Sequence, residues 1–107
     1  MSATPTNPSR VPAGKVAVEN VNHPGKVEHL DAAMYDAMKR AILQVLPSGK
    51  PGLTVAQVQQ GVLAHLPEAL YPGGAKAGWW TKAVQLDLEA KRIIVREKVS
   101  PLRLHRT

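Results

Sequence analysis

Three clusters of proline and glycine divide this chain and limit the length of any helix in it. They lie at residues 22–25, 47–52 and 67–74. Proline fixes φ and removes a backbone donor, and glycine favours turns and helix ends, so a helix does not run through such clusters. The stretches between and after them predict three helices, over residues 31–46, about 54–66 and about 75–91.

The first two predicted helices begin at recognisable caps. Asp31 is a natural N-cap, and Thr54 followed by Gln57 forms a capping-box pattern. Apolar residues at three- and four-residue spacing give each helix one buried face. In the second helix Gly61 is a weak helix former, and a close approach to another helix would explain its presence.

The third predicted helix has two apolar strips. Trp80, Val84 and Leu88 form the inner strip, because they lie four residues apart. A second strip, on the flank, is made of Trp79, Ala83, Leu86 and Ala90. This arrangement leaves Lys82, Gln85 and Glu89 pointing outward. We expect Trp80 inside the core and Trp79 partly exposed.

Short β segments complete the pattern. Alternating apolar residues at 16–21 predict a strand or extended arm, and the β-branched residues at 93–97 predict a strand that a turn at 98–101 joins to a second one. The order of elements is typical of an α+β winged helix-turn-helix domain, with three helices and a C-terminal β-hairpin wing. We expect a single domain over residues 16–107 and a disordered tail over residues 1–15.

The charge of the chain favours a polyanionic partner. Its net charge is +6, and residues 76–107 carry eight of the 14 lysines and arginines but only three acidic residues. Basic proteins attract polyanions, of which nucleic acid is the commonest in cells. We therefore expect duplex DNA as the partner of a small transcriptional regulator.

The predicted DNA contacts lie on the third helix and the wing. A recognition helix places side chains in the major groove, and wing cations neutralise phosphates. A glycine-rich loop before the third helix adds a position for one phosphate. The candidate residues are Lys76, Thr81, Lys82, Gln85, Arg96, Lys98, Arg103 and Arg106. An ordinary solvated helix face and a charged edge strand are the structural alternatives.

Trp79 and Leu86 suggest a second kind of partner. A large apolar side chain at the surface of a helix is typical of protein contacts. A homodimer would also extend the few base pairs that one winged helix reads. The alternative function is therefore a protein-interaction or dimerisation module that binds no nucleic acid.

Nothing in the sequence predicts catalysis, a metal or a cofactor. The chain has no cysteine, and His23, His29, His65 and His105 show no zinc-ligand spacing. The glycine-rich loop lacks the spacing of a phosphate-binding P-loop. No apolar stretch is long enough for a membrane span. We expect a cytoplasmic protein that is not an enzyme.

Several motifs together mark a resemblance to a known family. They are Asn20–Gly25, Pro51–Thr54, Tyr71–Trp80 and Val84–Lys91 followed by Ile93–Ile94. These segments resemble a small bacterial family of unknown function, and the likeness covers most of the chain from His23 to Glu97. The third helix and wing are more loosely similar to the amino-terminal winged-helix module of modification-dependent restriction endonucleases. That second resemblance implies DNA binding, although no nuclease domain is attached here.

Overall fold

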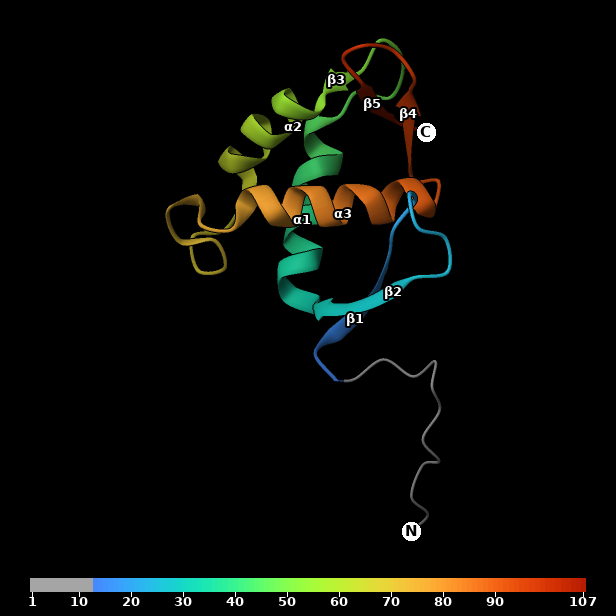
Figure 1. Ribbon diagram of the computed structural model, residues 1–107. Helices are drawn as coiled ribbons and strands as arrows, with labels where there is room; N and C mark the ends of the chain where they lie inside the picture. Colours follow the sequence, from blue (N-terminus) through green and yellow to red (C-terminus); the bar gives the residue numbers. More distant parts are fainter. Residues whose placement is uncertain (1–12) are drawn as a thin grey trace.

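The computed structural model describes residues 13–107, which form an α+β domain with three helices and two small antiparallel sheets (Figure 1). The predicted tail over residues 1–15 lies mostly outside the described residues, and Lys15 already belongs to the first strand. The elements in chain order are β1 (Lys15–Glu19), β2 (Val27–Asp31), α1 (Ala32–Val45), β3 (Leu53–Thr54), α2 (Val55–Val62), α3 (Ala77–Ala90), β4 (Ile94–Glu97) and β5 (Arg103–Arg106). Two short 3₁₀ turns, Leu63–His65 and Pro72–Gly74, lie between α2 and α3.

The predicted helix caps are confirmed. The Asp31 carboxylate accepts a hydrogen bond from the Met34 amide at 2.8 Å, at the start of α1. Thr54 and Gln57 exchange both bonds of a capping box at the start of α2. The second helix is shorter than predicted, because the α-helix ends at Val62 and the chain continues as a 3₁₀ turn.

The larger sheet joins the middle of the chain to its end. Its strand order is β3–β5–β4, and all pairs are antiparallel. The C-terminal hairpin of β4 and β5 has the register Ile94↔Arg106 to Glu97↔Arg103. The predicted hairpin is therefore confirmed, and the two residues of β3 add a third strand to its β5 edge.

The smaller sheet is a hairpin of β1 and β2, and β2 was not predicted. The sequence pattern at 27–31, Val-Glu-His-Leu-Asp, lacks the alternation that marks a strand. It becomes a strand because it pairs along its whole length with β1, from Glu19↔Val27 to Lys15↔Asp31. The expected extended arm is thus one half of a hairpin.

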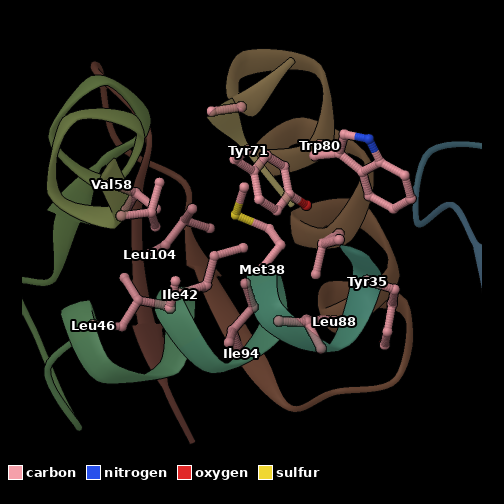
Figure 2. Close-up of a cluster of buried hydrophobic side chains, with 14 of the residues drawn as sticks. Tyr35, Met38, Ile42, Leu46, Val58, Tyr71, Trp80, Leu88, Ile94 and Leu104 are labelled. Carbon is pink, nitrogen blue, oxygen red and sulfur yellow. The ribbon is translucent and has the colours of Figure 1, made fainter. Parts of the chain in front are cut away.

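The core lies where the three helices meet the larger sheet (Figure 2). Its central side chains come from every large element and are fully buried: Met38, Ile42, Val58, Val84, Leu88 and Leu104. Tyr71 is also buried in this core, and its hydroxyl donates a hydrogen bond to the Met34 carbonyl at 2.8 Å. Trp80 is buried, as predicted.

Gly61 confirms the predicted close approach of two helices. A Cβ atom at this position of α2 would lie only 2.9 Å from Cγ1 of Val45 on α1. Because real Cβ contacts are almost never that short, a larger residue would force the Val45 side chain or one of the helices to shift. Close packing of α1 and α2 therefore explains why a residue of low helix propensity lies inside α2.

Figure 1 shows how the third helix relates to these parts. α3 crosses the domain, with the β1–β2 hairpin on one side and the β3–β5–β4 sheet on the other. It packs against α1, α2, β1 and β4. α3 is thus an interior helix along much of its length.

Gly14 and Gly52 provide a matched test of the packing around β5. Both have a left-handed φ, +75° and +76°, but a Cβ on Gly52 would lie 2.3 Å from the Leu104 carbonyl oxygen, whereas Gly14 faces open space. Gly14→Ala therefore carries only the backbone strain of about 1 kcal/mol. We expect Gly52→Ala to lower the free energy of unfolding by at least about 2 kcal/mol more, since backbone must move. Urea denaturation of both variants measures this difference, and equal losses would contradict it.

Candidate nucleic-acid interface

The side chain of Asp87 ties α3 to the amino-terminal hairpin and to α1. It is fully buried, accepts a hydrogen bond from the Tyr35 hydroxyl of α1 and accepts another from the Glu19 amide of β1 at 2.8 Å. The Nζ atom of Lys91, one turn further along the chain, forms an ion pair with Oδ1 of Asp87 at 2.6 Å. The partner of Asp87 on another helix is thus a tyrosine, and its basic partner lies in the chain just beyond α3.

Burial and the bond to Asp87 act in the same direction on Tyr35. Burial is the larger cause, and together they raise the pKa of the Tyr35 hydroxyl above its ordinary value. The hydroxyl therefore stays protonated and keeps donating to the carboxylate. This bond fixes α1 against α3.

Glu89 of α3 forms a second internal network, with a residue of β4. Its carboxylate accepts two bonds from the Arg96 guanidinium of β4, at 2.5 and 3.1 Å, and one from the Gln85 amide at 2.9 Å. The hydrogen bond to Glu89 raises the pKa of Arg96. The guanidinium of Arg96, predicted to contact phosphate, is instead held in an ion pair with Glu89.

The prediction that Gln85 and Glu89 point outward from α3 is wrong, whereas Lys82 is exposed as predicted. Thr81 is 0% exposed and donates its hydroxyl to the Ala77 carbonyl at 2.6 Å, and Gln85 is 1% exposed. Glu89, also expected to point outward, is buried. Tertiary contacts bury these side chains. Thr81 lies next to Met38 of α1, and Asp87 and Glu89 hold the β1–β2 hairpin and β4 against the second half of α3.

The flank of α3 divides into an exposed part and a covered part. Trp79 is 55% exposed, as predicted, and Lys82 is exposed beside it. Leu86, predicted to share a partner surface with Trp79, is only 8% exposed. Its carbonyl accepts a hydrogen bond from the Val21 amide at 3.3 Å, so the segment after β1 covers this turn of the helix.

The arginines of β5 each use part of their hydrogen-bonding capacity for contacts within the fold. Arg103 donates to the Gly52 carbonyl at 3.0 Å, and Arg106 donates to the Leu46 carbonyl at 2.9 Å. Each bond uses one of the five N–H groups of a guanidinium. Lys98, in the turn after β4, is exposed. These residues anchor the hairpin and still carry charge at its surface.

Seven exposed cations have no ion pair within residues 13–107: Lys15, Lys26, Lys76, Lys82, Arg92, Lys98 and Arg106. Four of them, Lys76, Lys82, Arg92 and Lys98, lie on α3, next to its ends or in the turn after β4, and we call these four the cationic set. Lys76 and Arg92 flank α3 and both have a left-handed φ. Sequence reasoning missed Arg92, whose signal would have been its place just after the last helical residue.

The cationic set extends along both sides of the turn after β1. Lys82 and Asn20 line one pocket, next to Lys26. Arg92, Arg96 and Lys98 line a groove with Val21 and Asn22. Because residues 20–22 are consecutive, three of the four cations border one short segment of chain. Lys26 was also missed, because no helix or wing was expected there.

Within residues 13–107 no group of three histidine, cysteine, aspartate or glutamate side chains could hold a metal ion. No helix in the same range is long and apolar enough to cross a membrane.

Comparison with known proteins gives one match. A family model, described as a family of unknown function (DUF6958), matches residues 15–104. The chain belongs to this family. The resemblance inferred from the sequence motifs is thus confirmed at the level of a family without assigned function, and the match spans all the elements from β1 into β5. No curated protein and no solved structure matches the chain, so the likeness to restriction endonuclease modules gains no support.

His105 and Glu97 make the stability of the β4–β5 hairpin depend on pH. The His105 ring nitrogens lie 2.8 Å from the Arg106 carbonyl and 2.7 Å from Glu97, so both face acceptors and suit a protonated ring. The bond to Arg106, followed by the one to Glu97, raises the pKa of His105 above 6.5. The bond from His105 lowers the pKa of Glu97 below 4.5.

The direction of the pH effect follows from these two shifts. His105 stabilises the fold fully below pH 6.5, and this contribution is lost as the pH rises through its folded-state pKa. The ionised Glu97 contributes to the free energy of unfolding above pH 4.5, and this contribution is lost as the pH falls through its lowered pKa. We expect the free energy of unfolding to fall between pH 6 and pH 9, and the fall to be smaller in His105→Gln. Urea denaturation at several pH values measures this, and identical pH profiles for both proteins would contradict it.

Proposed function

We propose that this domain is a winged helix that binds duplex DNA through phosphate contacts, without reading bases from α3. The order α1–β3–α2–α3–β4–β5 and the sheet order β3–β5–β4 support the winged-helix assignment. In that assignment the β4–β5 hairpin is the wing. The DNA-binding part of the proposal depends on charge.

The distribution of charge is the observation that carries the proposal. Three of the eight acidic residues, Asp87, Glu89 and Glu97, are occupied by internal partners. The cationic set has no such partners within the described residues, and three of its members border the segment 20–22. Because the partners of these carboxylates are themselves basic, pairing leaves the net charge unchanged, and the positive excess around α3 and the wing is carried by cations that have no ion pair within the described residues.

Burial of the predicted base-reading side chains decides what kind of contact is supported. Base recognition needs polar side chains such as glutamine at the groove edge. Thr81 and Gln85 are inside the protein. Lysine and arginine at the surface neutralise phosphates and release counterions instead, which gives affinity without sequence information.

Fluorescence anisotropy with labelled duplexes tests the proposal. Contacts to three or four phosphates predict a slope of roughly −3 in log affinity against log salt concentration, since each contact contributes about −0.9. We expect Lys82→Ala and Lys98→Ala each to reduce the slope by about 0.9. Affinity for two unrelated duplex sequences should agree within a factor of about three, because no base is read.

Lys15→Ala provides the matched control. It removes one exposed positive charge at the start of β1, away from the wing (Figure 1). The control should bind like the unaltered protein. Absence of binding at low salt, or equal effects of all three alanine variants, would overturn the proposal.

A further inference from the structure

A cleft lies between the β1–β2 hairpin and the exposed part of α3. It has a volume of about 210 Å³, and its apolar side chains include Leu30 from β2 and Trp79 and Leu86 from α3. Trp79 is 55% exposed although it packs edge-on against Trp80, at 5.4 Å between ring centroids. The proposed phosphate contacts make no use of this indole.

The outer edge of β2 borders the same cleft and is open. On β1, the Glu19 amide and the Ala17 carbonyl point toward Asp87 and Lys91, away from β2. In an antiparallel pair the opposite residues then also point outward, so Val27 and His29 direct their backbone groups away from β1. The sheet has two strands, and no strand within residues 13–107 pairs with this edge.

The open edge of β2 and the cleft beside Trp79 are placed so that a strand added to β2 would reach both. Glu28 and Leu30 of β2 line the cleft. A strand added to β2 would direct alternate side chains to the same face, next to these residues. Backbone bonds to Val27 and His29 would supply affinity, and one side chain in the cleft would supply specificity.

The charges around the cleft indicate the chemistry of the added strand. Lys26 and Lys82 line it, against the single carboxylate of Glu28, and neither lysine has an ion pair within the described residues. A peptide with carboxylates beside its apolar side chain would complement the two lysines. The volume limits the insertion to about one large side chain.

We propose that β2 and this cleft bind an extended peptide segment of a partner protein, which adds as a third strand. The segment carries one large apolar side chain for the cleft, flanked by aspartate or glutamate. This site does not depend on DNA binding, because Trp79, Leu30 and the β2 edge belong to no proposed phosphate contact. Only Lys82 is shared by the two.

Selection from a phage-displayed library of random nonapeptides on the full chain tests the proposal. Enriched sequences should share one large apolar residue with an acidic residue within two positions. A fluorescein-labelled consensus peptide should bind with a Kd at least tenfold weaker for Trp79→Ala, with folding checked by circular dichroism. Val99→Ala is the matched control, because Val99 is equally exposed but lies in the wing turn, and it should leave the Kd unchanged.

Two further readouts separate strand addition from simple pocket filling. The peptide should shift the amide resonances of Val27 and His29 in ¹⁵N spectra, and His29→Pro should weaken binding at least fivefold relative to His29→Ala, since proline removes an outward donor. Enrichment that is equal on the Trp79→Ala variant, a basic consensus, or unshifted β2 amides would overturn the proposal. Self-association abolished by Trp79→Ala would also overturn it, by showing that a second copy fills the cleft.

Discussion

A single buried carboxylate determines how the parts of this domain are placed. Asp87 on α3 holds the Tyr35 hydroxyl of α1, the Glu19 amide of β1 and the Lys91 ammonium group. An ionised group that is fully buried is tolerated only when it is paired and hydrogen bonded, and loss of its partners costs several kcal/mol. Tyr35, Glu19 and Lys91 must therefore be in place together. The ammonium group of Lys91 also lies 5.7 Å from the centre of the Tyr35 ring, which strengthens the same junction.

This junction has a consequence for function. By fixing β1 against α3, it brings the segment after β1 over Leu86, while Arg96 closes over Glu89 from the other side. The second half of α3 becomes interior, and only its first turns, with Trp79 and Lys82, reach the surface. A helix covered in this way does not fit deeply into a major groove. The surface around the exposed part of α3 includes Lys82 and the cleft beside Trp79.

Much of the fold could be predicted from the sequence because its signals are local. Proline and glycine mark the helix limits, Asp31 and Thr54 act within one turn, and the spacing of Trp80, Val84 and Leu88 identifies the inner face of α3. The second strand could not be predicted, because its pattern is weak and only its pairing with β1 makes it a strand. The candidate site was predicted less well, because it depends on tertiary contacts, which the helical periodicity of a sequence does not report. Helical spacing identifies one buried face, whereas Glu89 is held inside by a bond from Arg96, on a strand that follows the helix, and Gln85 donates to the same Glu89 carboxylate.

Thiol accessibility along α3 tests most directly whether the predicted recognition face is interior. The chain contains no cysteine, so single substitutions report cleanly. Thr81 and Lys82 are neighbours in sequence, yet the first is buried and the second exposed. Under native conditions, Thr81→Cys should react with a thiol reagent at least a hundredfold more slowly than Lys82→Cys, since roughly 3 kcal/mol of opening free energy already gives that factor. Similar rates for the two would contradict the account and return α3 to the role of an exposed recognition helix.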